Sequence, residues 1–295
     1  MKRLGYLFLM MAALSACHNN KKSDAYGNFE AVEVTLSSQA NGQILVLNIL
    51  EGDQVHEGDT IGLVDTVDLY LKREQLVKNT SVLNAKLQSI RSQIQVQEQQ
   101  KKNLLVDKDR LDKLFADGAA TKKQMDDMQG NLDLIDQQIE ATKVQEESVY
   151  AEKATLVTQI SQVEESLSKC WIVTPVSGTI LAKYAEKGEV TAFGKPICKL
   201  ADLSVMELKV YVSGSQLPYL KIDDKVSVLI DKDRNDLSEL SGNVSWISSM
   251  AEFTPKTIQT REERVNLVYA AKILVPNDGS LKIGMPAEIN FMPAR

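Results

Sequence analysis

Few residues of this chain could do nucleophilic or metal chemistry. It contains two histidines, His18 and His56, and three cysteines, Cys17, Cys170 and Cys198. A Ser-His-Asp triad needs a histidine that a carboxylate holds in place, and a zinc site needs several histidine or cysteine ligands together. The two histidines are far apart in the sequence, and His56 lies among charged residues in a predicted turn. A His-based triad and a multi-histidine metal site are therefore not expected, and no enzymatic activity is predicted.

The first residues have the pattern of an export signal. Lys2 and Arg3 are positively charged, and residues 4–14 form an apolar run that is too short to span a bilayer. The run leads into Leu14-Ser15-Ala16-Cys17, which resembles the bacterial lipobox, where cleavage leaves the cysteine at the new N-terminus for acylation. We therefore expect a lipoprotein signal peptide at residues 1–16 and a lipid anchor at Cys17. The alternative is a plain secretory signal in which Cys17 is incidental.

Export would carry Cys170 and Cys198 into an oxidising compartment. A disulfide between them could form there. Two separate buried thiols are the favoured interpretation, because a free cysteine packs like a small apolar residue.

The composition narrows the class of protein further. A chain of 295 residues is long enough for two or three domains. Its net charge of −6 argues against broad nucleic-acid binding, so no nucleic-acid partner is expected. Aromatic residues make up only 5 % of the chain, which favours a protein dominated by coiled coil over one with a single large core.

A pattern of glycines occurs twice, with the same spacing each time. The first copy has steps of 10 and 6 residues, and the second copy repeats both steps; the glycines are Gly42, Gly52 and Gly58, then Gly178, Gly188 and Gly194. Apolar residues alternate between these glycines, as in half-buried strands, and the acidic residues Asp53 and Asp59 follow turn glycines. The pattern predicts one small β-domain that is split into residues 41–66 and 171–202.

The segment between the two halves, residues 67–170, is predicted to be a helical hairpin. Gly118 and Gly130 are its only glycines, and it contains no proline. Gly118 suits the left-handed position that follows a helix end, and Thr121 with Gln124 forms a capping-box pattern that starts a second helix. The two arms are nearly equal in length, and at ~1.5 Å rise per residue each reaches roughly 70 Å.

The apolar residues of both arms follow a heptad pattern. In the first arm they recur every seventh position from Leu69 to Leu111, with polar Gln97 as an interruption, and an offset row contains Leu87, Ile94 and Phe115. The return arm alternates steps of four and three from Met128 to Leu167. Around Gln97 and Lys101, opposite roughly Asp136 and Glu140, the predicted seam is polar. This layer could set the register or be an ordinary solvated face, which is favoured, or it could pack against a neighbouring hairpin.

After Ser204 the sequence changes to alternating apolar and polar residues with short turns. Strands are predicted at 205–212, 226–230, 244–247, 265–275 and 287–291, interrupted by a looser stretch at 249–263. A small β-barrel is therefore predicted at residues 203–295. The segment from Phe29 to Leu36 also alternates and is expected to add a strand to this barrel, within an N-terminal linker at residues 17–40.

The order of these parts resembles the periplasmic adaptor, or membrane fusion protein, family of haemolysin D and multidrug efflux type. The two halves look like a split biotinyl/lipoyl domain at Glu51-Gly52-Asp53-Gln54-Val55 and Thr174-Pro175-Val176-Ser177-Gly178. The resemblance implies an elongated α+β fold, in which a long antiparallel coiled-coil hairpin is inserted into a split lipoyl-like β-domain and followed by a small β-barrel. It also implies a non-enzymatic adaptor in the periplasm of a Gram-negative bacterium, anchored by lipid to the inner membrane.

The resemblance extends to the hairpin tip. The tip motif of the family is an arginine, a leucine four residues later and a serine seven residues after that; Arg110, Leu114 and Thr121 stand in those positions, with threonine in place of serine. By resemblance this tip, with Gly118 in its turn, docks against a TolC-type outer-membrane channel. The alternative is that Arg110 is a solvated charge, Leu114 a seam residue and Thr121 merely a helix N-cap.

Partners are also implied by the resemblance. Glu252-Phe253-Thr254-Pro255-Lys256, Arg261 and Val265-Asn266-Leu267-Val268-Tyr269 look like a loop and strand of adaptors that serve ABC-type exporters, which are favoured over RND-type transporters as the inner-membrane partner. Family members assemble into rings, so self-association, as a hexamer by resemblance, is expected.

Two other functions compete with the adaptor. A biotinyl or lipoyl carrier needs a lysine at the turn that joins the two halves, but here Asp65-Thr66 leads into the helical insertion, so no cofactor is expected. An exported coiled-coil scaffold lipoprotein without a transport role is the other alternative. The glycine repeat argues against it, because a scaffold does not need a split β-domain.

Overall fold

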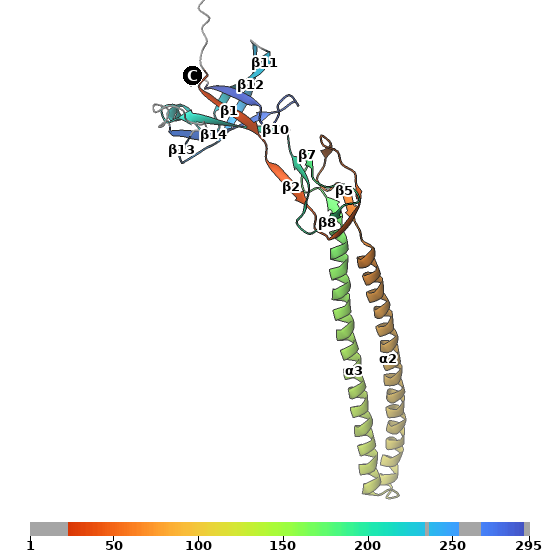
Figure 1. The fold of residues 1–295 in the computed structure, drawn as a ribbon. Helices are drawn as coiled ribbons and strands as arrows, with labels where there is room; N and C mark the ends of the chain where they lie inside the picture. The colour runs from red at the N-terminus through yellow and green to blue at the C-terminus, as the bar shows by residue number, and fades with distance from the viewer. Residues whose placement is uncertain (1–22, 234–235, 254–266, 292–295) are drawn as a thin grey trace, which may run out of the picture.

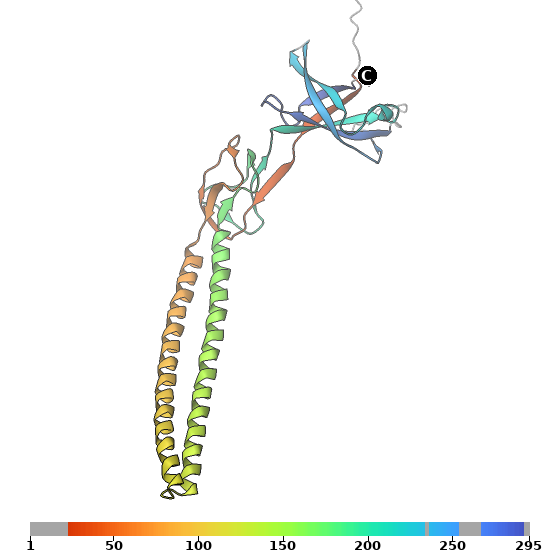
Figure 2. The ribbon, with the colours of Figure 1, turned by 180° about the vertical axis from the view of Figure 1, so that it is seen from behind.

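The computed structural model describes residues 23–233, 236–253 and 267–291. Figure 1 shows three parts in one elongated molecule: a helical hairpin, a small β module at its base, and a β-barrel beyond the module. Figure 2 shows the same order from behind, with both helices reaching away from the barrel. The predicted α+β architecture, a hairpin inserted into a split lipoyl-like domain and followed by a barrel, is confirmed.

The hairpin consists of helix α2, Val67–Ala116, and helix α3, Lys122–Ser168. The turn between them has the predicted local chemistry. Gly118 adopts a φ of 71°, which favours glycine. Thr121 caps α3, with its side chain accepting from Gln124 N and the Gln124 side chain accepting from Thr121 N, so the capping box is confirmed.

The seam between the helices is apolar in its half nearest the β module. The side chains buried there against one another are Leu83, Leu87, Ile90, Ile94, Val149 and Leu156. Farther out, α3 continues to bury Leu132, Ile135 and Ile139, whereas α2, which is described throughout, has no buried residue beyond Ile94. The predicted polar layer lies at this change, where Lys101 Nζ is 2.6 Å from Asp136 Oδ1.

The prediction that Phe115 belongs to the seam is wrong. Its side chain is 45 % exposed, so it does not lie in the seam. The preceding members of the same row, Lys101 and Lys108, remain half-buried, so the row leaves the interface only in the last turn of α2, where the chain turns into α3.

The β module is formed by eight strands, four from each side of the hairpin. The first four are β2 Glu33–Ser37, β3 Gly42–Leu47, β4 Gln54–Val55 and β5 Thr60–Val64. The last four are β6 Trp171–Val173, β7 Gly178–Lys183, β8 Val190–Thr191 and β9 Pro196–Ala201. They form two sheets, in the orders β2-β9-β7-β4 and β6-β5-β3-β8. Each sheet therefore mixes strands from both halves.

The two halves exchange equivalent hydrogen bonds. Strand β7 begins at Gly178 and β3 at Gly42, an offset of 178 − 42 = 136 residues. Gly52 N donates to Ile180 O and Gly188 N donates to Ile44 O, both at 2.8 Å, and the same offset of 136 relates the two bonds. The glycine repeat thus corresponds to a twofold-like arrangement in which each half completes the sheets of the other.

The repeat extends farther upstream than the glycine pattern predicted. Gly58 N donates to Thr174 O and Gly194 N donates to Ser38 O, again with the offset of 136. Strand β2 before Ser38 and strand β6 before Thr174 are therefore equivalent. The expectation that all of Phe29–Leu36 joins the barrel is wrong for its second part, because β2 pairs with β9 in the module.

The barrel contains the remaining strands: β1 Ala25–Glu30, β10 Val205–Ser213, β11 Lys225–Asp233, β12 Asp236–Ile247, β13 Glu252–Phe253, β14 Leu267–Pro276 and β15 Pro286–Phe291. They follow the order β10-β1-β15-β11-β12-β14-β13, and the pairing of β10 with β14 closes the sheet. A one-turn 3₁₀ helix, η2 Leu217–Tyr219, follows β10. The inward-facing side chains, including Phe29, Leu208, Ile273 and Ile289, form one buried core.

Across the described residues, neither helix has the length and apolar character needed to cross a membrane. Both long helices belong to the hairpin, and most of their residues are polar and exposed.

The β module depends on close backbone approach at Gly178, which gives a stability prediction. A Cβ atom at Gly178 would lie 2.5 Å from the backbone oxygen of Ala201, whereas a Cβ at Gly130, within α3, would meet nothing within 4 Å. Gly178→Ala should destabilise the module by about 1–3 kcal/mol through overpacking, and hydrogen–deuterium exchange should accelerate in β7 and β9. The control Gly130→Ala should stabilise α3 by about 0.5–1 kcal/mol. Equal exchange rates of β7 and β9 in wild type and Gly178→Ala would contradict the prediction.

Candidate functional site

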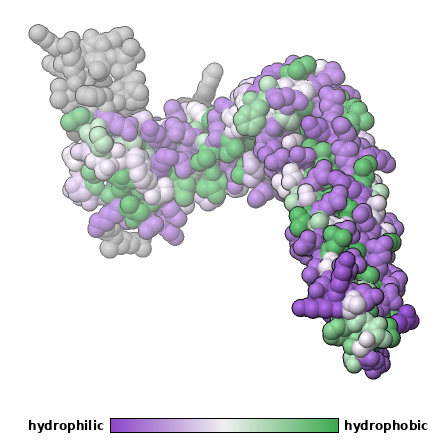
Figure 3. Space-filling model, turned by 90° about the horizontal axis from the view of Figure 1, so that it is seen from below, coloured by the Kyte–Doolittle hydropathy of each residue, from purple (hydrophilic) through white to green (hydrophobic). Residues whose placement is uncertain are grey.

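The hairpin tip is the candidate site, because it exposes apolar side chains at the far end of the molecule. Leu114 and Phe115, in the last turn of α2, are 49 % and 45 % exposed. Figure 3 shows a pale green, hydrophobic end on the hairpin, bordered by purple hydrophilic residues. At the end of a protruding arm, such side chains are placed where a partner can cover them.

The turn holds these residues through backbone hydrogen bonds. Gly118 N donates to Phe115 O at 3.1 Å, and Ala119 N donates to Leu114 O at 2.8 Å. This is the bonding of a helix that ends in a left-handed glycine, in which carbonyls of the last turn are satisfied by the residues that follow. The positions of Leu114 and Phe115 are therefore fixed by the turn itself.

The polar residues of the tip motif already have partners within the chain. Arg110 Nη1 lies 3.2 Å from Asp107 Oδ1, on a side chain that is 72 % exposed. The Thr121 hydroxyl accepts from Gln124 N and donates to Gln124 Oε1 at 3.0 Å. Arg110 keeps other guanidinium donors free, but the hydroxyl of Thr121 is engaged in capping. The N-cap role of Thr121 is thus observed, while Leu114 and Arg110 project into solvent.

The structure places the predicted tip residues together. Arg110 and Leu114 are one turn apart on the same side of α2, and Gly118 and Thr121 lie in the turn that follows. Phe115 was missed as a surface residue because the heptad pattern assigned it to the seam. Cys17 lies outside the described residues, as do Thr254-Pro255-Lys256, Arg261 and Val265-Asn266 of the loop segment.

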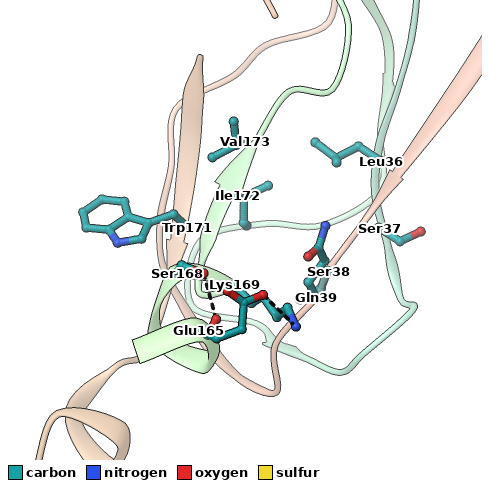
Figure 4. Close-up of a pocket in the computed structure, with 10 residues that line it drawn as sticks. All are labelled: Leu36, Ser37, Ser38, Gln39, Glu165, Ser168, Lys169, Trp171, Ile172 and Val173. Atoms are coloured by element: carbon teal, nitrogen blue, oxygen red, sulfur yellow. Dashed lines mark hydrogen bonds and ion pairs between the residues drawn. The ribbon is translucent and has the colours of Figure 1, made fainter. Parts of the chain in front are cut away.

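A second feature is a pocket at the base of the hairpin, with a volume of about 230 Å³. Figure 4 shows that the end of α3 and strand β6 form one side and that the end of β2 faces them. Its charged groups pair with each other, since Lys169 Nζ lies 3.1 Å from Glu165 Oε1, and Ser168 Oγ donates to Glu165 O. The side chain of Trp171 is 52 % exposed beside it. A second serine of the pocket, Ser38, likewise donates its hydroxyl to a backbone oxygen, that of Ala40.

The two described cysteines are separate, buried thiols. Burial raises the pKa of Cys198 to about 11, and burial followed by the nearby Asp65 carboxylate raises the pKa of Cys170. Both thiols therefore stay protonated and unreactive near neutral pH. Within the described ranges, no group of three or more histidine, cysteine or acidic side chains could hold a metal ion.

Comparison with known proteins identifies the family. A family model described as "RND MFP, barrel-sandwich hybrid domain" matches residues 32–200, which is more than half of the chain and covers the whole hairpin and β module. A UPF0194 membrane protein of Yersinia pseudotuberculosis is 25 % identical over 298 residues, covering 92 % of this chain and 90 % of the relative. The UPF0194 membrane protein YbhG of Salmonella gallinarum is 23 % identical over 291 residues, covering 90 % of this chain and 87 % of the relative.

Solved structures show the same fold. MacA from Actinobacillus actinomycetemcomitans superposes with a TM-score of 0.59 at 21 % identity, covering 92 % of this chain and 78 % of MacA. The membrane fusion protein Spr0693 from Streptococcus pneumoniae gives a TM-score of 0.58 at 13 % identity, covering 92 % and 98 %. At these identities the likeness concerns the fold, and the assignment rests on the family model. The chain therefore belongs to the membrane fusion protein family of non-enzymatic adaptors, through the barrel-sandwich hybrid domain described for its RND members.

Proposed function

We propose that this chain links an inner-membrane exporter to a TolC-type outer-membrane channel, and that it docks on the channel through the hairpin tip. The observation that carries the proposal is the position of exposed Leu114 and Phe115 at the end of a two-helix arm whose other ends are held together in one β module. Helix α2 has 50 residues, so at ~1.5 Å per residue the arm reaches roughly 75 Å. Reach of this kind suits a bridge across the periplasm.

Several copies are proposed to act together. By resemblance to the family we propose a ring, a hexamer, which would enclose a continuous path between the two membranes. Head-to-tail contacts between identical copies close into rings when the rotation allows it. The stiff hairpins would then present several tips to one channel at once, and such multivalent contact raises the overall affinity without new contacts at each tip.

Cys17 is proposed as a lipid anchor in the inner membrane. Its place after Leu14-Ser15-Ala16 supports this proposal. The described chain starts at Ser23 and enters strand β1 of the barrel, so an anchor at Cys17 would hold the barrel next to a membrane. Acylation of this kind supplies more than one chain, which is what stable anchoring needs.

An ABC-type exporter is proposed as the inner-membrane partner, in preference to an RND-type transporter. The segment from Glu252 to Tyr269 supports this choice by resemblance. In the described part of the segment, Glu252 pairs with Val268 and Phe253 with Leu267, so β13 extends the barrel sheet beyond β14. The family model carries the RND name, so the choice of transporter needs its own test.

The tip assignment predicts the effect of two substitutions. Leu114→Ser and Arg110→Asp should each abolish export and capture of the outer-membrane channel, because they remove the apolar contact or reverse the exposed charge. Folding and membrane attachment should be unchanged. Channel capture can be measured with a photocrosslinking residue in place of the neighbouring exposed Phe115, in the wild-type background and in each variant, and identification of the product by mass spectrometry. The control is Val82→Ser, at a side chain that is 66 % exposed on the hairpin shaft. Wild-type transport in both tip variants would mean that the chain does not dock through this tip.

The anchor predicts where a cysteine variant will be found. Cys17→Ala should move the protein from the membrane to the soluble fraction, because the acyl chains supply the main membrane affinity. Export should be weakened but not abolished, because contacts with other proteins also hold the adaptor in place. Fractionation before and after a high-salt wash measures the effect. Retention of the variant on membranes after the wash would show that the lipid is not the main anchor.

The class of transporter predicts the energy source. If the partner is an ABC-type exporter, export should stop when ATP hydrolysis is inhibited and should persist when a protonophore collapses the proton gradient. Both treatments can be compared in membrane vesicles that contain the assembled system. The opposite pattern would identify an RND-type partner and leave the tip assignment untouched.

A further inference from the structure

One end of the barrel carries exposed apolar side chains, most of which lie outside the segment from Glu252 to Tyr269 that is proposed above to contact the exporter. Four of them stand out by exposure: Tyr219 at 76 %, Met250 at 75 %, Ile222 at 57 % and Leu267 at 50 %. They come from three separate segments, namely the η2 loop after β10, the loop before β13, and the start of β14.

The strand registers place these segments on one rim of the barrel. The end of β10 meets the start of β14, with Ser213 opposite Val268, and β13 joins the same place, with Glu252 opposite Val268. The start of β1 lies at this rim too, since Tyr26 is opposite Tyr211 near the end of β10. We call this set of turns and strand ends the outer rim.

The outer rim faces away from the hairpin. Strand β1 runs from the rim at Ala25 to Glu30, and only residues 31–32 separate it from β2 in the β module. The opposite end of the barrel therefore adjoins the module. Figure 1 shows β13 on the side of the barrel that is remote from the module and the helices.

The N-terminal chain leaves from the outer rim and is fastened there. Asp24 N donates to Ile289 O at 2.9 Å, and Asp24 Oδ2 accepts from Phe291 N at 2.9 Å. Gln216 Nε2, in the loop that leads to η2, donates to Asp24 O at 2.6 Å. The exit point of the chain is thus fixed next to the loop that carries Tyr219 and Ile222.

The short stretch of chain between Cys17 and Ser23 limits how far the outer rim can lie from a membrane that holds Cys17. From Cys17 to Ser23 there are 23 − 17 = 6 residue steps. At ~3.6 Å per residue an extended chain of this length spans at most roughly 22 Å. If Cys17 carries acyl chains in the bilayer, the bilayer surface lies within this distance of the rim. The bilayer is therefore close to the rim in every anchored copy of the protein.

We propose that the outer rim rests on the membrane surface, with Tyr219, Ile222 and Met250 inserted among the lipid headgroups. The proposal rests on the anchor at Cys17 proposed above. Tyrosine and aliphatic side chains on turns suit the interfacial layer, where an apolar body and a polar tip are both accommodated. The rim then acts as a second membrane contact that fixes the orientation of the barrel, which a lipid on a free tether cannot do.

The described charges beside these side chains are balanced. Lys221 and Lys225 flank Asp223 and Asp224 in the loop that follows η2, and these four charges cancel. Glu252 has a partner in Lys209, with Nζ and Oε2 3.9 Å apart. Tyr219, Ile222 and Met250 are therefore expected to insert by burial of apolar surface, in neutral vesicles as well as in anionic ones.

The test uses the full acylated protein with a nitroxide label at one of two matched positions. Tyr219→Cys places the label on the rim. Phe193→Cys, at a side chain that is also 76 % exposed but lies in the turn after β8, is the control. The native thiols Cys170 and Cys198 are buried and do not compete for label. Collision with oxygen and with a water-soluble nickel complex is measured in phosphatidylcholine vesicles, with and without phosphatidylglycerol, and in solution for the Cys17→Ala form.

The label at position 219 should gain contact with oxygen and lose contact with the nickel complex in both kinds of vesicle, while the label at 193 stays as in solution. Met250→Cys serves as a second rim position if Tyr219→Cys does not fold. Aqueous behaviour at 219 in a protein whose acylation is verified by mass spectrometry overturns the rim contact alone. An unmodified Cys17 overturns the anchor and the rim contact together. Shielding at 219 only in native inner-membrane vesicles assigns the rim to a protein partner and overturns the proposal.

Discussion

The exchange of hydrogen bonds between the two halves of the β module is the interaction on which the rest of the molecule depends. Gly52 N bonds to Ile180 O, and Gly188 N bonds to Ile44 O, across a gap of more than a hundred residues. Neither half can form its sheets alone, because each sheet takes strands from both. The base of both helices is therefore fixed only when the module is complete, and the direction of the hairpin follows from it.

The hairpin extends from this fixed base as two long antiparallel helices. Its apolar seam is concentrated near the module, where Leu83 to Ile94 pack against Val149 and Leu156. Beyond the Lys101–Asp136 ion pair the first helix buries no further side chain in its described length, so the far half is held by fewer apolar contacts. An exposed ion pair contributes little stability by itself, so the far half of the arm depends on the side chains that α3 buries there and on the hydrogen-bonded turn at Gly118.

Exposed apolar residues occur along the whole molecule, and both of its far ends carry some of them. At the tip they are Leu114 and Phe115, and at the outer rim of the barrel they include Tyr219 and Met250. Covering the part of these side chains that is still exposed would stabilise a complex by roughly 25 cal/mol per Å² of apolar surface. Their placement at opposite ends fits a protein that works between two surfaces, with the hairpin and the β module setting the distance between them.

The sequence by itself determined the features that depend on neighbouring residues. The glycine spacing marked the turns where Gly52, Gly58, Gly188 and Gly194 adopt positive φ, and the capping box at Thr121 and the left-handed Gly118 set the ends of the helices. These local signals determined the order and length of the split β module, the hairpin and the barrel. That order was enough to indicate the family. What only the tertiary structure decided is which strands pair: β2 joins the module and not the barrel, and the halves interleave. Turns and caps are fixed by residues three or four positions apart, whereas strand pairing and side-chain exposure depend on segments that meet only after the chain has folded.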